Sequence, residues 1–244
     1  MLVSVSGAII AAGRGERLRP AVGELPKPLV EIGGQTLLER QIGLMLNAGL
    51  SPVHVIVNSE TARLAAARGL KFHEDVVLSV ADTPNSMESL LRLGEQIRSE
   101  GFILATVDSV IPRHDFMEFV ERSRAAIEAH DGCDGMLGIC RWQGDERPLF
   151  VTRSSSGFIT SFGEQEQPWV TAGIYSFNSR IFDLTDAARQ RGLNALRRFL
   201  ALLLEHGMRL KGHELSKVVD LDSGDELAQA KAWLEDAASA KAGR

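Results

Sequence analysis

Short apolar runs alternate with longer segments of helical character between residues 5 and 140. The apolar runs are VSGAII (5–10), VHVIV (53–57), DVVLSV (75–80), FILATV (102–107) and GMLGIC (135–140). Residues 13–28 are expected to form a long loop, and helices are expected at 35–49, 85–97 and 114–130. This alternation is typical of β-α-β units. It therefore predicts an α/β fold: a three-layer α/β/α sandwich with a mixed, mostly parallel sheet.

The second half of the chain has a different pattern. Residues 148–162 alternate around a Ser/Gly turn, which predicts a β-hairpin, and TAGIYSF (171–177) predicts another strand. A helix with a strong apolar face follows at 194–207, and 217–237 reads as a strand, an acidic turn and a helix. No repeat or linker divides the chain. We therefore expect a single domain over residues 1–244, with a small β-rich insertion at about 141–178 on the acceptor side.

Composition and charge exclude several classes of protein. The 244 residues are 44% hydrophobic and 24% charged, as in an ordinary globular protein, and the net charge of −5 argues against a general nucleic-acid binder. Two cysteines are too few for a disulfide framework. The N-terminal apolar run lacks the basic start of a signal peptide, and no apolar run approaches membrane-spanning length. We expect a cytoplasmic protein that binds neither nucleic acid nor membranes.

The stretch AIIAAGRGERLRP, Ala8 to Pro20, ends the first expected strand in a turn with two glycines and three arginines. Such a turn exposes unpaired backbone N–H groups to an anion. Downstream, Lys27 stands between two prolines that stiffen its segment. The GxxxxGK[ST] pattern is absent, and GxGxxG fails because Leu18 takes the place of the third glycine, which argues against a nicotinamide-dependent reductase.

Taken together, AAGRGERLRP and PKPLVEIGGQTLLER resemble the signature of nucleotidyltransferases that join a nucleoside triphosphate to a sugar phosphate or alcohol phosphate. The resemblance implies a Rossmann-like fold of glycosyltransferase-A type. It also implies that the catalytic residues are Arg17, Lys27 and Asp108. The implied nucleotide-binding residues in the loop are Ala11, Ala12, Gly13, Arg14 and Gly15.

Triphosphate chemistry needs a divalent cation, for which we expect Mg²⁺ held by carboxylates. Asp108 is a candidate because it follows the expected strand FILATV, and ligands gather at the carboxyl ends of strands in open α/β sheets. The family places a second aspartate in a D-x-G-T-x-x-x-L motif before the last helix. Counting back from Leu227 gives Asp220 as this ligand, with Asp222 as the alternative.

The segment NSMESL resembles the version found in relatives that use CTP and an alcohol phosphate. Asn85 and Ser86 are therefore expected to contact the nucleotide, although Asn85 also suits the first position before a helix.

On the acceptor side the family has a Glu-Lys-Pro motif, whose lysine binds the acceptor phosphate. This chain has GEQEQPWVTAGIY instead, so the resemblance points to Glu164, Thr171 and Gly173. Glu166 is an alternative to Glu164. Arg153 or Lys217 could take the role of the missing lysine.

The predicted reaction transfers a nucleoside monophosphate from a nucleoside triphosphate to a sugar 1-phosphate or related phosphorylated small molecule, with release of pyrophosphate. Two alternatives remain open. One is a CTP-dependent cytidylyltransferase that acts on an alcohol phosphate such as phosphocholine or inositol phosphate. The other is a non-catalytic nucleotide-binding module.

Overall fold

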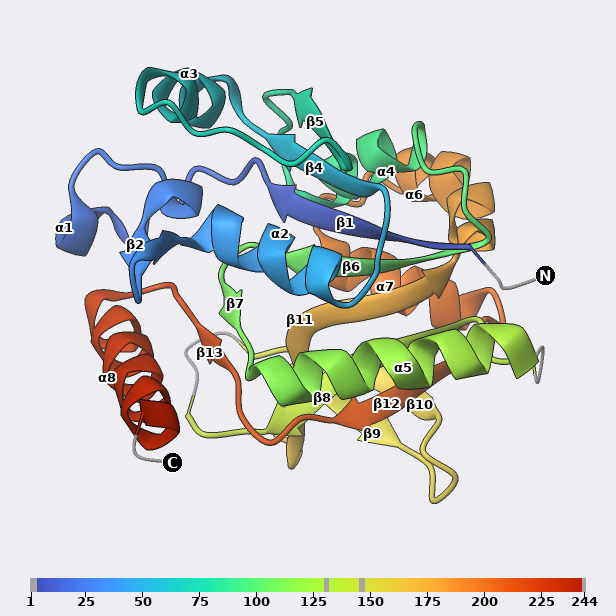
Figure 1. Cartoon of the computed structure of the whole chain (residues 1–244). Coiled ribbons are helices and arrows are strands. Elements are labelled where there is room, and N and C mark those ends of the chain that lie inside the picture. The colour runs from blue at the N-terminus through green and yellow to red at the C-terminus, as the bar shows by residue number, and fades with distance from the viewer. Residues whose placement is uncertain (1–3, 130–131, 145–147, 243–244) are drawn as a thin grey trace.

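The first half of the chain builds a parallel sheet. In the computed structural model, which describes residues 4–129, 132–144 and 148–242, this half forms the layer seen at the centre of Figure 1. Its strands lie side by side in the order β6 (Gly101–Thr106), β1 (Val5–Ala11), β4 (Val53–Val57) and β5 (Val76–Val80). Strands β1 and β4 are buried along their whole length, which explains their uninterrupted apolar sequences.

Strand β11 (Trp169–Asn178) continues this sheet into the second half of the chain by pairing antiparallel with β6. Beyond it lie β8 (Gly135–Arg141), β12 (Leu210–Glu214) and the hairpin of β9 (Phe150–Arg153) and β10 (Ile159–Gly163). The predicted hairpin is therefore confirmed. Residues 145–147 of the predicted β-rich insertion lie outside the described residues.

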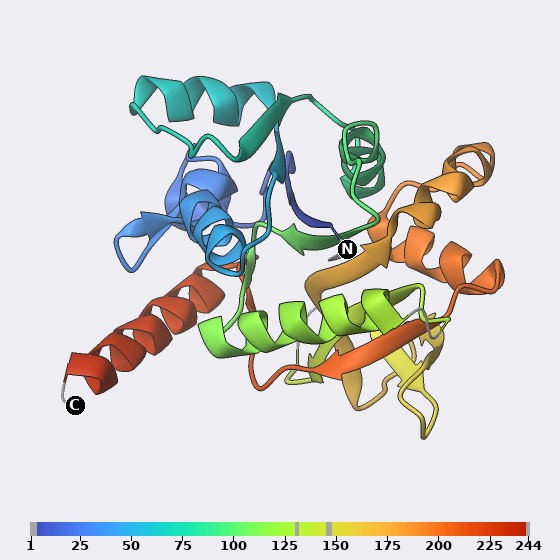
Figure 2. The same cartoon turned by 45° about the vertical axis from the view of Figure 1, so that its right-hand side comes forward.

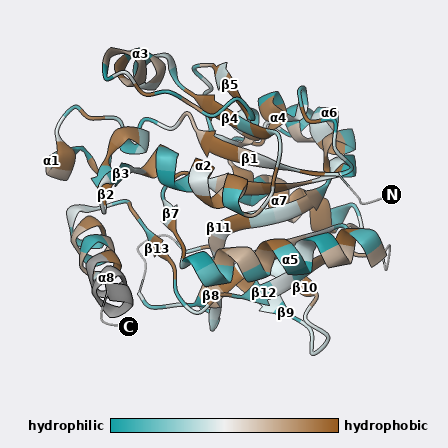
Figure 3. Ribbon diagram, viewed as in Figure 1, coloured by the Kyte–Doolittle hydropathy of each residue, from teal (hydrophilic) through white to brown (hydrophobic). Residues whose placement is uncertain are grey.

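Helices cover both faces of the sheet (Figures 1 and 2). Each face has its own apolar core. The central strands β1 and β4 are among the most hydrophobic parts of the ribbon (Figure 3). This arrangement confirms the predicted three-layer α/β/α sandwich with a mixed sheet. One face carries α2 (Leu37–Asn47) and α5 (Arg113–Ala129), and the other carries α4 (Ser86–Gly94), α6 (Thr185–Gln190) and α7 (Leu196–Glu205).

The predicted helix starts agree with the structure. Thr36 caps α2 in a capping box with Glu39, and the Asn85 side chain accepts a hydrogen bond from the N–H of Glu88 at the start of α4. Gly49, with φ of +69°, follows the end of α2 as expected. His130, the predicted end of α5, lies outside the described residues.

Several elements were not predicted. The expected loop at 13–28 contains the short helix α1 (Arg19–Val22), and a 3₁₀ turn begins at Lys27 (Lys27–Leu29). Helix α3 (Ser59–Ala67) and strand β12 were missed as well. The sequence of β12, LKGHE, is mostly polar, and only its pairing with buried β8 makes it a strand.

Two short ribbons lie beside the main sheet. Strand β7 (Ser109–Val110) pairs with β13 (Val219–Asp220), and β2 (Glu31–Ile32) pairs with β3 (Gln35–Thr36). The first ribbon leads into α8 (Gly224–Ala242) and so joins the end of the chain to the segment that follows β6. None of the helices in the described part of the chain is long and apolar enough to cross a bilayer.

Candidate functional site

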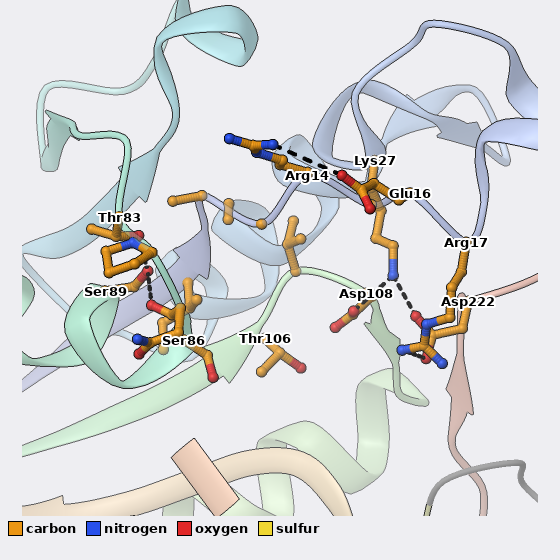
Figure 4. A pocket seen from close by; sticks show the side chains of 18 residues that line it. Arg14, Glu16, Arg17, Lys27, Thr83, Ser86, Ser89, Thr106, Asp108 and Asp222 are labelled. Carbon is orange, nitrogen blue, oxygen red and sulfur yellow. Dashed lines mark hydrogen bonds and ion pairs between the residues drawn. The ribbon is translucent and has the colours of Figure 1, made fainter. Parts of the chain in front are cut away.

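A cavity of about 620 Å³ opens at the carboxyl ends of β1 and β6, beside the start of α4 (Figure 4). After β1 the chain adds β4 on one side and β6 on the other, and ligands in open α/β sheets bind where the strand order reverses in this way. Ten predicted residues line this cavity: Ala11, Ala12, Gly13, Arg14, Gly15, Arg17, Lys27, Asn85, Ser86 and Asp108.

The two glycines of the opening loop differ in what they provide. Gly15 has φ of +61°, and a Cβ there would lie 2.8 Å from the Cβ of Lys27. Gly13 has nothing within 4 Å of the position of a Cβ. Gly15 therefore permits the close approach of Lys27, whereas Gly13 leaves space beside the cavity. Asn58 holds the start of the loop, because its Nδ2 donates to the carbonyl oxygen of Ala12 at 3.2 Å.

Four charged side chains meet at the base of the cavity (Figure 4). Lys27 is 7% exposed, and its Nζ lies 3.0 Å from Asp108 Oδ2 and 2.7 Å from Asp222 Oδ1. Arg17 pairs with the other oxygen of Asp222 at 2.7 Å. Two cations and two carboxylates thus compensate one another where the loop, the end of β6 and the segment after β13 come together.

The charges in this network stabilise one another. Burial alone would lower the pKa of Lys27, but the carboxylates of Asp108 and Asp222 outweigh that effect and raise it. Burial alone would raise the pKa of Asp108, but the Lys27 ammonium and its hydrogen bond lower it. Lys27 is therefore charged and Asp108 is ionised at neutral pH, so this end of the cavity can interact with both phosphates and cations.

The β7–β13 ribbon positions the late aspartates. Asp220 stands opposite Ser109 in this ribbon, is exposed, and accepts a hydrogen bond from the Ser109 hydroxyl at 2.5 Å. Asp220 is not among the residues that line the cavity, whereas Asp222 is. The backbone N–H of Asp222 donates to Glu226 at 2.7 Å, which ties it to the start of α8. The structure thus brings Asp222, the alternative, into contact with Lys27.

The start of α4 forms the far wall of the cavity. The Asn85 side chain caps the helix, and the Ser86 hydroxyl accepts a hydrogen bond from the N–H of Leu196. Sequence reasoning missed Thr83 and Ser89, whose hydroxyls are 2.6 Å apart in this wall. Their proximity to Asn85 in the sequence was the available signal.

The predicted acceptor residues do not line this cavity. Gly173 has φ of +67° and packs against the end of β6 and the start of β7. A Cβ on Gly173 would be 1.8 Å from Ser109 Oγ. The Thr171 side chain hydrogen-bonds to Tyr175, whose pKa is raised by burial first and then by the charge of Asp220. Glu164 is exposed in the loop between β10 and β11.

The two candidates for the missing lysine are engaged elsewhere. Arg153 forms an ion pair with Glu214 and lies over the ring of Trp169, with its Cζ 4.4 Å from the ring centroid. Lys217 lies over the ring of Trp233 at 5.0 Å. Neither residue lines the nucleotide cavity.

Known proteins resemble this chain in sequence and in fold. Mannose-1-phosphate guanyltransferase from Pichia angusta is 29% identical over 200 residues, which cover 75% of this chain and 52% of that protein. The chain spans about half the length of the curated relatives it matches.

Two solved structures share the fold over nearly the whole of both chains. The inositol-1-phosphate CTP transferase from T. maritima has a TM-score of 0.75 at 16% identity, covering 95% of this chain and 96% of that one. The CTP:phosphocholine cytidylyltransferase from Streptococcus pneumoniae has a TM-score of 0.71 at 17% identity, covering 95% and 100%.

The chain matches a family model over much more than the opening loop. The model of the MobA-like NTP transferase domain matches residues 7–205, a range that takes in the glycine-arginine loop, Lys27, the start of α4 and Asp108. The matched range also includes the strands at whose ends the cavity opens. The chain therefore belongs to the MobA-like NTP transferase family of nucleotidyltransferases.

Proposed function

We propose that this protein transfers a nucleoside monophosphate from a nucleoside triphosphate to the phosphate of a sugar 1-phosphate and releases pyrophosphate. The observation that carries the proposal is the buried Lys27, held between Asp108 and Asp222 beside the open glycine loop. The similarity of the chain to the sequence of mannose-1-phosphate guanyltransferase supports a sugar phosphate as the acceptor. We place the reaction in the cytoplasm, where such phosphorylated metabolites are made and used.

Nucleotidyltransferases generally use a divalent metal ion, because phosphate oxygens repel an anionic nucleophile. Mg²⁺ is usually held by one or two carboxylates, with phosphates and water as its other ligands. The residues at this site fit that requirement, since all of the carboxylates near Lys27 offer hard oxygen donors. In the described ranges, no group of three or more His, Cys, Asp or Glu side chains could hold a metal ion.

We propose that Asp108 and Asp222 would hold the Mg²⁺. Both line the cavity and both bond to Lys27 Nζ, whereas Asp220 does not line the cavity. Asp222 also pairs with Arg17 and so keeps the two cations in place for the phosphates. When bound, the ion would supply positive charge that neutralises phosphate oxygens.

The chain's own groups then act by position and charge. Backbone N–H groups around Gly13, together with Arg17, bind the β- and γ-phosphates. Lys27 neutralises charge where the α-phosphate and the acceptor phosphate meet. An acceptor phosphate oxygen attacks the α-phosphorus in line and forms the new P–O bond as the α–β bridging bond breaks. Pyrophosphate leaves with that electron pair. No general base is needed, because the attacking oxygen is already ionised.

The acceptor side is rich in hydroxyl groups. Thr106 Oγ1 and Ser109 Oγ are 2.8 Å apart, and Ser109 bonds to Asp220. Thr171 bonds to Tyr175, four residues further along β11. Hydroxyls and a carboxylate recognise polyhydroxylated acceptors by hydrogen bonds. This favours a sugar phosphate or inositol phosphate over phosphocholine, whose quaternary ammonium cannot donate such bonds.

A CTP-dependent reaction on an alcohol phosphate is the second candidate. It is supported by fold similarity over nearly the whole chain to two enzymes whose names state CTP as the substrate. The two candidates differ in base and acceptor but share the same phosphate chemistry.

A pyrophosphate-release screen tests the proposal. ATP, CTP, GTP and UTP are each combined with mannose 1-phosphate, glucose 1-phosphate, inositol 1-phosphate and phosphocholine in the presence of Mg²⁺. We expect release with one triphosphate and a sugar 1-phosphate, none in the presence of EDTA, and release from Asp108→Asn that is slower by about 10² or more. Triphosphate binding without release for every acceptor would instead identify a non-catalytic nucleotide-binding module.

The metal assignment has its own experiment. Asp222→Asn should raise the Mg²⁺ concentration needed for half-maximal rate, whereas Asp220→Asn should leave that concentration close to the wild-type value. The opposite pattern would identify Asp220 as the metal ligand.

A further inference from the structure

We propose that Gln41, on α2, is a positioning residue that fixes the turn carrying Asp108. The inference rests on the proposed function in one respect, namely that Asp108 binds the catalytic cation. Gln41 is 2% exposed, in the middle of α2, and does not line the nucleotide cavity. Its side chain therefore acts on the site through the backbone behind it.

The Gln41 amide bonds to the backbone on both sides of Asp108. Its Nε2 lies 2.6 Å from the carbonyl oxygen of Ser109 and 3.4 Å from that of Thr106. These two carbonyls are the ends of the four-residue turn that contains Asp108. One NH₂ group thus closes the turn from behind, while the Asp108 side chain faces Lys27 in front.

Only a donor suits this position. Both backbone groups that face Nε2 are acceptors, so the orientation of the amide is determined by its surroundings. The Gln41 Oε1 is buried and has no hydrogen-bond partner in the part of the chain that the structure describes. A side chain placed only for packing would bury no such oxygen, because burying an unpaired acceptor is unfavourable. The amide is explained by the two bonds that its NH₂ group makes.

Helix α2 also joins the turn to the segment that carries Lys27. The N–H of Leu37, the first residue of the helix, donates to the carbonyl oxygen of Val30 at 2.9 Å, one residue beyond the 3₁₀ turn that contains Lys27. The Thr36–Glu39 capping box fixes this end of the helix. Helix α2 packs between β1 and α5 (Figure 1). Helix α2 thus sets the position of Asp108 relative to Lys27, with Gln41 as the contact on the Asp108 side.

The test is Gln41→Met, which keeps the length and approximate volume of the side chain but removes both donated hydrogen bonds. We expect Mn²⁺ binding, measured by EPR with CTP and separately with GTP in the absence of acceptor, to weaken about fivefold or more. We expect kcat to fall about tenfold or more, since small displacements of catalytic groups have effects of that size, while the KM for the triphosphate stays within about threefold. Thermal unfolding shows whether the variant is folded.

Asn47→Met is the matched control. Asn47 is an exposed amide on the same helix whose Nδ2 donates to the carbonyl oxygen of Gly43, away from the turn. This variant should match wild type in Mn²⁺ binding and in kcat. If Gln41→Met does not fold, Gln41→Asn takes its place, because the shorter amide cannot reach both carbonyls.

Three outcomes decide the matter. Weakened Mn²⁺ binding in a folded Gln41 variant supports the inference. Wild-type Mn²⁺ affinity in a folded variant overturns it, and so does unfolding of both variants, since Gln41 would then serve the fold. The Mn²⁺ measurement needs no turnover. If wild-type protein binds Mn²⁺ through Asp108 but forms no product, the proposed function fails while the role of Gln41 is still decided.

Discussion

The proposed nucleotide side and the proposed acceptor side of the site are built in different ways. The nucleotide side, made of the loop 11–17, Lys27, the start of α4 and Asp108, is contributed by short continuous segments that follow strands of a parallel sheet. The acceptor side, around Gly173 and Thr171, lies where β11 changes register between its neighbouring strands. The nucleotide side can therefore be recognised from sequence motifs. The acceptor side depends on which strands pair, and in what register.

The largest effect should come from the nucleotide side. Asp108→Asn keeps the size of the side chain but removes the charge that faces Lys27 and the proposed cation. We expect kcat to fall by about 10²–10³ or more, as for loss of one group that stabilises transition-state charge. Steady-state pyrophosphate release measures this fall.

Asp82→Asn is the matched control for Asp108→Asn. Asp82 is an exposed carboxylate that accepts hydrogen bonds from Ser59 outside the cavity. This variant should retain the wild-type rate. Equal rates for the two variants, with both folded by circular dichroism, would contradict the role given to Asp108.

Gly173→Ala and Gly13→Ala compare a glycine from each side. At Gly173 an alanine would have to adopt a positive φ, with its Cβ 1.8 Å from Ser109 Oγ. We expect Gly173→Ala to lower the free energy of unfolding by about 2–4 kcal/mol. Gly13→Ala meets nothing within 4 Å and should change that free energy by about 0.5 kcal/mol or less.

Urea unfolding of both glycine variants provides the measurement. Gly13→Ala should act on function instead, by raising the KM for the triphosphate where the loop meets phosphates. Similar stability losses in the two variants would show that β11 tolerates a side chain at Gly173, where its register changes. The two glycines would then differ less in packing than the structure indicates.

Two histidines, one in each half of the sheet, predict how stability changes with pH. Burial, and then the charge of Arg98, lowers the pKa of His54 on β4, and burial lowers the pKa of His213 on β12. The folded state therefore keeps both rings neutral, while the unfolded chain takes up protons below about pH 6.5. Stability is full above that pH and falls as the pH drops through 6.5 toward the lowered pKa of each ring.

His54→Gln and His213→Gln should each flatten the loss of stability between pH 7.5 and 5.5. His54 is 5% exposed, whereas His213 is only half-buried against Phe119, so the flattening should be larger for His54. Thermal melts across this pH range show which of the two variants has the larger effect. A steeper loss in His54→Gln would contradict the neutral state of the buried ring.

Much of the fold and of the nucleotide side could be predicted from the sequence. The order of buried strands, the turn at Gly15 and the cap at Asn85 are all local features, determined by residues a few positions apart. β12 could not be predicted, because its polar sequence becomes a strand only through pairing with β8. The second metal ligand was left between Asp220 and Asp222, since a motif count gives a position in the chain and not the neighbour in space.

The smallest effect should come from the edge of the acceptor side. Glu164 is exposed beyond β10, where water competes for every hydrogen bond and screens its charge. Glu164→Gln should therefore raise the KM for the acceptor by no more than about threefold and leave kcat unchanged. Thr171→Val is the paired variant, because Thr171 lies on β11 and bonds to the buried Tyr175, and its effect on the same KM should be larger. A tenfold rise for Glu164→Gln with little change for Thr171→Val would reverse this order. The acceptor would then be bound by the loop between β10 and β11, and the acceptor side would resemble the nucleotide side in being built from a continuous segment.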